Sequence, residues 1–347
     1  MPMNERPSTL VESIFRLQEL ADYIVPFGIR AVCDLRVADC LVGGPRSVGE
    51  LAAVVGAHEG SLFRVLRALA CKGIFTEVEP GVFGLTPLAD LLRSDHPLSL
   101  AEAYPLMSAN FRAWSEFDHT LRTGESAFEH VFGTDYYAYL ATSPRDSARY
   151  DGIQRAGTRL ELRAMLRAID WGRFDHVVDV GGNNGAFLAG LLARHKHMRG
   201  TLLDLPHAVG AAPALLAEAG VGERCEVVAG SFFDGVPAGA DAYVLKRVLY
   251  DWPDDRAGDL LDVVRAAMRP DSRLLLLDPV IQPADAFDVG KIYDLLSLAM
   301  LAGKARTREE VIDLLDRHGL TVTRVVETPM FPIVEAALRA PDGARSP

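Results

Sequence analysis

Closely spaced glycines shortly after an acidic residue are the feature of this chain best suited to bind a ligand. In the segment His176–Gly185, which reads HVVDVGGNNG, an apolar, β-branched run ends at Asp179 and leads into Gly181 and Gly182. The helical pattern that follows gives the order strand, tight turn, helix. Glycines let such a turn pass close to a ligand, and the helix start offers free backbone N–H groups. This order predicts a ligand-binding loop; the alternative is a turn with a purely structural role.

A second acidic residue strengthens this interpretation. The run Gly200–Pro206, which reads GTLLDLP, is strand-like and contains Asp204 near its end. Nucleotide-binding βαβ units carry, about 20 residues beyond their glycines, a carboxylate that accepts hydrogen bonds from ribose hydroxyls. Asp204 lies at about that spacing. The two features together predict a site for a nucleoside cofactor.

The composition is typical of a globular enzyme and disfavours nucleic acid or membranes as partners. Of the 347 residues, 49% are hydrophobic and 24% are charged, and the net charge is −11. This acidity disfavours binding to phosphate backbones, and no apolar run reaches the roughly 18 residues that span a bilayer. The N-terminus lacks a signal-peptide pattern, and the four cysteines show no metal-binding spacing. We expect reduced thiols, a cytoplasmic location and no bound metal.

The elements before the glycine turn begin with a predicted domain at residues 1–97. Ser47 is followed three residues later by Glu50, which is the capping-box pattern for a helix over 48–55. A second helix is predicted at about 60–71, and a short hairpin turning at a Pro-Gly pair follows it. Two helices and a β-wing are the winged-helix arrangement.

The basic residues of this predicted domain are too sparse for DNA recognition. The second helix offers only Arg64, Arg67 and Lys72, whereas a DNA-reading helix normally has a denser basic face. We therefore expect the winged-helix-like domain to serve dimerisation. A ligand-responsive DNA-binding regulator is the alternative of a different class.

Residues 98–170 form a predicted helical linker that is rich in aromatic side chains. Most of these are expected in the core, but aromatic residues placed before a cofactor domain are equally suited to wall a pocket for a planar substrate. They are Tyr104, Phe111, Trp114, Phe117, Phe128, Phe132, Tyr136, Tyr137, Tyr139 and Tyr150.

Residues 171–347 alternate between strand and helix patterns, which predicts an α/β domain with a Rossmann-like parallel sheet. The last two strands follow each other directly and predict an antiparallel C-terminal hairpin. The strands are expected at 176–181, 200–205, 225–230, 241–248, 273–281, 321–327 and 331–338, and the helices at 184–195, 208–219, 254–268 and 307–318. Ligands of such sheets bind beyond the carboxyl ends of the strands.

The sequence at four of these strand ends resembles the class I S-adenosylmethionine-dependent methyltransferases. More narrowly, it is similar to the small-molecule O-methyltransferases that include plant caffeate and bacterial polyketide-tailoring enzymes. DVGGNNG resembles that family's DVGGGxG, LLDLP its LxDLP, and GSFFD its GDFF. YVLKRVLYDWPDDRA resembles YxLxxVLHDWxDxxx, and GKARTREE resembles GxERTxxE. The resemblance covers nearly the whole chain, including the dimerisation domain.

This resemblance implies that S-adenosyl-L-methionine is the cofactor, and it assigns eight residues to the cofactor site. The glycine turn would admit the methionine moiety, Asp204 would hold the ribose, and Lys246 would meet the cofactor carboxylate. Simpler roles are open for two of them, since Asp204 could cap a helix and Lys246 could be a solvated rim charge. The eight residues are Asp179, Gly181, Gly182, Asp204, Leu205, Ser231, Phe232 and Lys246.

The chain departs from the family at the catalytic base. The family's proton-abstracting histidine is replaced by Tyr250, and the glutamate that orients it is replaced by Ala305. An unperturbed tyrosine has a pKa of about 10 and is a poor base at neutral pH. The acidic side chains left at these strand ends are Asp251 and Asp278. Tyr250 could instead donate a hydrogen bond to a carbonyl or enolate, or could simply pack.

The family's spacing also points to substrate contacts in the linker and after the fifth strand. The same helical spacing is typical of core residues, so packing roles are the alternative for Leu296 and Met300. The candidates are Met107, Tyr150, Gln154, Leu296, Ser297 and Met300.

The resemblance implies an O-methyltransferase that acts on a hydroxyl of an aromatic or polyketide-like natural product and works as a homodimer through its N-terminal domain. Direct SN2 transfer would then be driven mainly by positioning, because the sulfonium donor is already activated. The departures leave an alternative, a non-methylating decarboxylase, hydroxylase or cyclase of the same fold that retains the cofactor.

Overall fold

The structure is a computed structural model that describes residues 10–340. The chain divides into two compact units, Met1–Leu106 and Met107–Pro347. Each unit has its own hydrophobic core. Among the described residues, no helix is long and apolar enough to cross a membrane.

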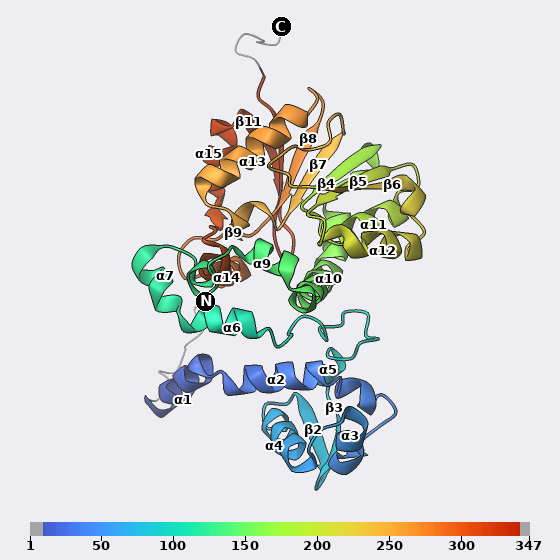
Figure 1. Cartoon of the computed structure of the whole chain (residues 1–347), viewed down its shortest axis with the longest axis vertical. Helices are drawn as coiled ribbons and strands as arrows, with labels where there is room; N and C mark the ends of the chain where they lie inside the picture. Colours follow the sequence, from blue (N-terminus) through green and yellow to red (C-terminus); the bar gives the residue numbers. More distant parts are fainter. Residues whose placement is uncertain (1–9, 341–347) are drawn as a thin grey trace, which may run out of the picture. The chain divides into compact units, whose positions relative to one another are not determined.

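The first unit combines helices with a small antiparallel sheet (Figure 1). Helices α3 and α4 are followed by the β2–β3 hairpin, which is the helix–helix–wing order expected from the sequence. Ser47 accepts the Glu50 backbone N–H while the Glu50 carboxylate accepts the Ser47 N–H, so the expected capping box is present. The elements are α1 Leu10–Ala21, α2 Ile24–Asp34, β1 Arg46–Ser47, α3 Val48–Val55, α4 Glu59–Ala70, β2 Phe75–Glu79, β3 Val82–Leu85 and α5 Pro87–Asp90.

A helical segment opens the second unit. Its aromatic side chains pack on one another and on Ala299 and Met300 of the later helix α14. The boundary between the units falls after Leu106, so most of the expected linker 98–170 belongs to the same compact unit as the sheet. The helices are α6 Ser108–Ser115, α7 Phe117–Thr123, α8 Ala127–Phe132, α9 Tyr136–Thr142 and α10 Pro144–Ala168.

A seven-stranded sheet forms the centre of the second unit, in the order β11-β12-β8-β7-β4-β5-β6. The five strands from β8 to β6 are parallel, and the β11–β12 hairpin joins them in antiparallel fashion, as the sequence predicted. The strands are β4 His176–Val180, β5 Arg199–Asp204, β6 Cys225–Ala229, β7 Ala242–Lys246, β8 Arg273–Leu277, β11 Leu320–Val326 and β12 Ile333–Leu338.

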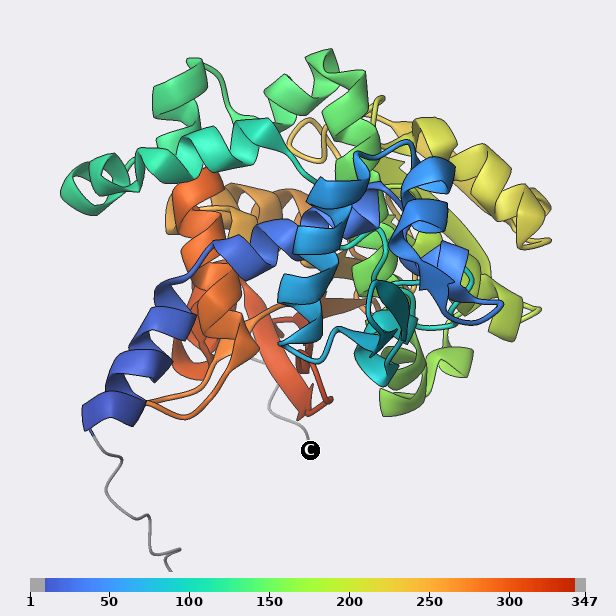
Figure 2. The same ribbon diagram turned by 90° about the horizontal axis from the view of Figure 1, so that it is seen from below.

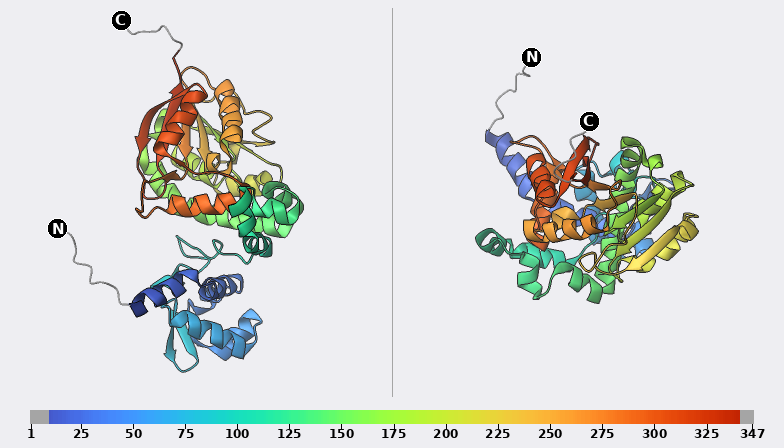
Figure 3. Two further views of the ribbon diagram at one scale, coloured as in Figure 1. Left: turned by 90° about the vertical axis from the view of Figure 1, so that its left-hand side faces the viewer. Right: turned by 90° about the horizontal axis from the view of Figure 1, so that it is seen from above.

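Helices cover both faces of this sheet, which Figures 2 and 3 show from further sides. Alternate residues of β7 divide between two cores: Tyr243 and Leu245 pack with α13 and α15, whereas Ala242 and Val244 pack with α11 and α12. A sheet buried on both faces explains the continuous apolar strands of the sequence. These helices are α11 Ala186–Arg194, α12 Ala212–Glu218, α13 Asp254–Ala267 and α15 Arg308–Arg317.

The structure differs from the expected elements after the fifth strand. The predicted single strand 273–281 is interrupted, because β8 ends at Leu277 and Asp278 turns its carboxylate to accept the backbone N–H groups of Val248 and Leu249. A short strand, β9 Val280–Ile281, then pairs with β10 Arg306–Thr307, and helix α14 Val289–Leu301 lies between them.

Candidate functional site

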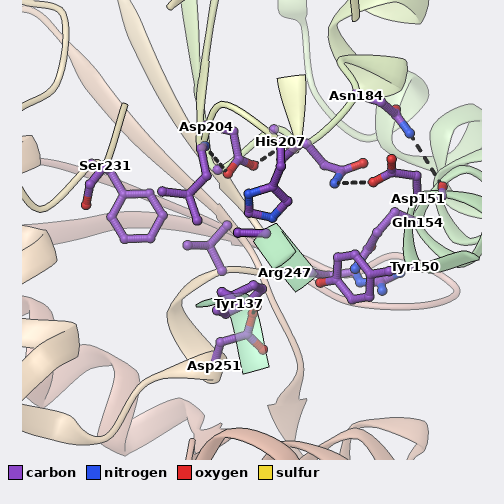
Figure 4. Close-up of a pocket in the computed structure, with 18 of the residues that line it drawn as sticks. Tyr137, Tyr150, Asp151, Gln154, Asn184, Asp204, His207, Ser231, Arg247 and Asp251 are labelled. Carbon is purple, nitrogen blue, oxygen red and sulfur yellow. Dashed lines mark hydrogen bonds between the residues drawn. The ribbon is translucent and has the colours of Figure 1, made fainter. Parts of the chain in front are cut away.

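A cavity of about 590 Å³ lies at the carboxyl ends of β4, β5, β6 and β7. Residues of α9 and α10 complete its wall, and Figure 4 shows the side chains that point into it. Ten of the site residues predicted from the sequence line this cavity. They are Tyr150, Gln154, Gly181, Gly182, Asp204, Leu205, Ser231, Phe232, Lys246 and Asp251.

The glycine turn between β4 and α11 cannot accommodate larger residues at its first two positions. Gly181 has a left-handed backbone (φ +74°), and a Cβ there would lie 2.8 Å from the Val248 side chain. A Cβ on Gly182 would lie 2.5 Å from Leu202. Asn183, at the family's third glycine, also has a positive φ of 51°, which asparagine tolerates better than most residues. The turn therefore brings bare backbone to the cavity wall.

Asp204, at the end of β5, holds this turn in place by a hydrogen bond and also lines the cavity. Its Oδ2 accepts the Asn183 N–H at 2.7 Å, and its Oδ1 accepts the Leu205 N–H at 2.7 Å. Burial raises the pKa of this carboxyl, and the two N–H donors oppose the shift. A carboxylate has about four acceptor positions, so two stay available for ligand hydroxyls. Neither of these hydrogen bonds caps a helix, which was the alternative role.

Asp179 lies buried beneath the glycine turn rather than on the cavity wall. Both of its carboxylate oxygens are without a hydrogen-bond partner among the described residues. Burial raises its pKa to about 7, with Lys246 acting in the opposite direction. An unpartnered carboxyl close behind the wall suits a ligand that carries positive charge, as S-adenosylmethionine does at its sulfur and amino group. The site therefore fits this cofactor.

Lys246 belongs to a buried charged cluster and is not a solvated rim charge. Its side chain is 8% exposed; Nζ lies 3.1 Å from Thr158 Oγ1 and 4.0 Å from Glu161 Oε2. Arg247, which sequence reasoning missed, lies 3.5 Å from the same glutamate and also lines the cavity. Gly157 has no side chain, and the Arg247 guanidinium occupies the space where a Cβ would lie. Burial lowers the pKa of Lys246 and Glu161 opposes that shift, so an anionic ligand group beside Nζ would favour the charged ammonium.

The part of the cavity wall that follows β5 and β6 is apolar and aromatic. Leu205, Ser231 and Phe232 follow β5 and β6, and Phe232 packs against Phe233 and Trp252. Ser231 stands where the family has an acidic residue, so this wall offers a hydroxyl in place of a charged acceptor. His207, which was not singled out from the sequence, also lines the cavity (Figure 4).

The structure separates the three candidate catalytic residues. Only Asp251 reaches the cavity wall. Tyr250 is 8% exposed and borders a separate small pocket together with Asp278. Burial raises the pKa of Tyr250 well above its usual value, which makes it a still poorer base. Burial also raises the pKa of Asp278 to about 6, but its oxygens already hold two backbone N–H groups.

Asp251 carries the strongest acid–base features of the cavity. Burial raises the pKa of its carboxyl to about 7. The Tyr137 hydroxyl donates to its Oδ2 at 2.5 Å, and both side chains line the cavity. Tyr137 was among the aromatic residues expected to wall a pocket. Its pairing with Asp251 carried no local sequence signal, because the two residues are 114 positions apart.

Of the six predicted substrate residues, two line the cavity and four do not. Tyr150 and Gln154 of α10 line the cavity. Met107 and Met300 are 2% and 3% exposed and pack in the aromatic core, which corresponds to the packing alternative for Met300. Buried Ser297 donates to the Tyr250 carbonyl at 2.9 Å. Leu296 is 39% exposed and does not line this cavity.

A seven-stranded sheet, parallel except for its C-terminal hairpin and with a cavity at the carboxyl ends of its strands, is the architecture that this chain shares with class I methyltransferases of known structure. The family described as the O-methyltransferase domain matches residues 114–321, and the O-methyltransferase dimerisation domain matches residues 18–95. A phenazine O-methyltransferase of Lysobacter antibioticus is 39% identical over 338 residues, which are 97% of this chain and 99% of that one.

Two further relatives differ in their chemistry. An O-methyltransferase from neocarzinostatin biosynthesis, solved in complex with S-adenosylmethionine and 2-hydroxy-5-methyl naphthoic acid, has a TM-score of 0.80 at 35% identity, covering 93% of this chain and 98% of that one. Aclacinomycin 10-hydroxylase of Streptomyces purpurascens is 32% identical over 313 residues, 88% of this chain and 84% of that one. The chain belongs to the O-methyltransferase family, and it is an S-adenosylmethionine-dependent enzyme with a dimerisation domain.

Proposed function

We propose that this enzyme methylates a hydroxyl group of a flat aromatic or polyketide-like natural product. One observation carries the proposal: a single cavity joins the glycine turn, Asp204 and Lys246 to Tyr137, Tyr150 and Asp251. The first group suits the cofactor, and the second supplies aromatic surface and a proton-accepting side chain for a planar acceptor.

The charges on the wall support a placement of the cofactor. Asp204 binds the ribose hydroxyls, Leu205 and Phe232 pack on the adenine, and Lys246 meets the carboxylate of the methionine part. The buried, unpartnered carboxyl of Asp179 would favour the positive groups of that part. When bound, the cofactor supplies a methyl group already activated by its positively charged sulfur. The protein's contribution is then to exclude water and to align the acceptor hydroxyl.

The acceptor's chemical class is inferred from the wall and from the relatives. The side chains of Tyr137, Tyr150 and Trp252 line the cavity. Ring faces of this kind favour a flat, unsaturated acceptor. The similar enzymes named above act on a phenazine or bind a naphthoic acid. We extend that class, a fused aromatic ring with a hydroxyl, to this chain.

The proposal includes a homodimer formed through the first unit and a cytoplasmic location. The first unit matches the dimerisation domain, and α1 buries none of its residues although it carries apolar side chains. Leu10, Phe15, Leu17 and Leu20 are each at least 66% exposed. An apolar helix of this kind suits a second copy of the same surface.

Calorimetry tests cofactor binding, and a methyl-transfer assay tests the reaction. Wild-type protein should bind S-adenosylmethionine, and Asp204→Ala should weaken the affinity about 10- to 100-fold, because it removes hydrogen bonds to a charged group. Asp234→Ala, at an exposed carboxylate outside the cavity, is the matched control and should leave the affinity unchanged. Absence of binding to the wild type would refute the proposal.

The second candidate function is a non-methylating reaction in the same cavity. It is favoured by the replacement of the family's histidine and glutamate by Tyr250 and Ala305, and by the similar hydroxylase. Methyl-labelled cofactor separates the two functions when hydroxylated naphthoic acids and phenazines serve as acceptors. Label in the product supports methyl transfer, whereas a changed product without label supports the alternative.

A further inference from the structure

The Tyr137–Asp251 hydrogen bond joins two elements at the cavity wall. Tyr137 lies in α9, and Asp251 ends the short helical turn Leu249–Asp251 that follows β7. The phenolic hydroxyl donates to the carboxylate at 2.5 Å, which is the short distance of a charge-assisted bond. The Tyr137 ring stacks on Trp252 with 29° between the ring planes, so its position is fixed by packing as well.

The position of Tyr250 leaves the acid–base role to its neighbour. Tyr250 replaces the family's histidine, but it does not line the cavity. It directly precedes Asp251 in the chain and favours the ionised form of that carboxyl. Asp251 is therefore the candidate catalytic residue that combines a place on the cavity wall with a phenolic hydrogen-bond donor, Tyr137.

Asp251 is surrounded by groups from several elements. Tyr136 and Tyr137 face it from α9 and Tyr150 from α10, while Arg247, Tyr250 and Asp278 face it from the carboxyl ends of β7 and β8. Burial raises the carboxyl pKa, and nearby Asp278 raises it further. Tyr137, Arg247 and Tyr250 favour the ionised form, and the resulting pKa is about 7. A base with such a pKa is matched to neutral pH.

We propose that Asp251 accepts the proton of the acceptor hydroxyl and that Tyr137 is the positioning residue that holds and tunes this carboxylate. This inference rests on the proposed methyl transfer and names the base of that reaction. Tyr137 itself is not the base, because burial raises its pKa well above the usual value for tyrosine. It keeps its proton and donates it in the hydrogen bond.

The step balances without a further reactant. The O–H bond of the acceptor breaks, and its proton passes to an Asp251 oxygen. The acceptor oxygen forms the new bond to the methyl carbon, while the electron pair of the broken methyl–sulfur bond stays on sulfur. After the product leaves, Asp251 releases its proton to solvent and the carboxylate is restored.

The first test is the pH profile of single-turnover methyl transfer. In the wild type the rate should rise with pH and level off above about pH 7, because the carboxylate form is the active one. Asp251→Asn should lower the rate about 10²- to 10⁴-fold and remove this rise. Asp251→Glu should regain part of the rate, since it restores a carboxylate. Asp255→Asn, an exposed carboxylate in α13, is the control.

Tyr137→Phe distinguishes a tuning role from a merely structural one. Loss of a hydrogen bond that stabilises the carboxylate should move the rise to higher pH by about one to two units. Tyr139→Phe is the matched control in the same helix: its hydroxyl contacts Asp146 at 2.8 Å, and it does not line the cavity. This control should leave the midpoint of the rise in place.

The second readout needs no turnover. Infrared difference spectra of cofactor-free protein with isotope-labelled aspartate should show two carboxyls that titrate near pH 7. One should disappear in Asp179→Asn, and the other should disappear in Asp251→Asn and shift upward in Tyr137→Phe. Unchanged profiles and spectra in these variants would overturn the inference while methyl transfer stands. Absence of cofactor binding and label transfer in the wild type would instead overturn the proposed function.

Discussion

Gly181→Ala tests how tightly the glycine turn is built. Gly181 lies at the end of β4 with φ +74°, and an added Cβ would lie 2.8 Å from Val248 and 3.4 Å from Phe232. A left-handed backbone costs a residue with a side chain about 1–2 kcal/mol. The contact with Val248 is far inside the ordinary 3.5–4.0 Å separation of carbon atoms, so that side chain must leave its preferred rotamer, which costs about 0.5–1.5 kcal/mol.

We therefore expect Gly181→Ala to lower the free energy of unfolding of the second unit by about 1.5–3.5 kcal/mol. Tryptophan fluorescence during urea unfolding measures this unit selectively, because Trp114, Trp171 and Trp252 all lie in it. The same variant should weaken S-adenosylmethionine binding in calorimetry, because the new methyl group occupies the wall where the methionine part is proposed to lie.

Gly220→Ala is the matched control for the backbone cost alone. Gly220 also has a left-handed φ of +67°, but no atom lies within 4 Å of an added Cβ, and the residue is outside the cavity. It should lose only about 1–2 kcal/mol and keep its affinity for the cofactor. Equal destabilisation of the two variants, or unchanged cofactor binding by Gly181→Ala, would refute this account of the turn.

Two further predictions concern stability. Burial raises the pKa of Asp179 from 3.8 to about 7, so the native state keeps a proton that the unfolded chain has released. The free energy of unfolding should therefore fall by up to about 1.4 kcal/mol per pH unit between about pH 4 and pH 7, and urea titrations of Asp179→Asn should lack this part of the fall. Ser47→Ala removes half of a capping box and should destabilise α3 by about 1 kcal/mol, measured as faster amide exchange in that helix; unchanged exchange would contradict the role of the cap.

The sheet and the cavity wall proposed to bind the cofactor were predictable because their signals are local. Parallel strands place their carboxyl ends at one edge, so Gly181, Asp204, Ser231 and Lys246 converge once each strand has been recognised. The capping box at Ser47 is equally local, since its two partners are three residues apart. Short-range patterns of this kind can be read without knowledge of the packing.

The part of the cavity proposed to bind the acceptor depends on contacts between residues that are far apart in the sequence. Arg247 and Glu161 are 86 positions apart, and Tyr137 and Asp251 are 114 apart. No spacing rule links such pairs; they meet because α9 and α10 close over the ends of the strands. The expected strand 273–281 was wrong for a related reason. Asp278 leaves the strand to bind backbone N–H groups near Val248, a partner 30 positions away.

The three buried aspartates at these strand ends show why hydrogen-bond partners, rather than pKa alone, sort the roles in this cavity. Burial raises the pKa of each well above the ordinary range. Asp278 is held by two backbone N–H groups and therefore fixes the loop after β7. Asp179 has no hydrogen-bond partner among the described residues and lies beneath the turn, which suits compensation by a ligand's positive charge. Asp251 alone combines a phenolic donor with a place on the cavity wall, so a proton taken from an acceptor can reach it.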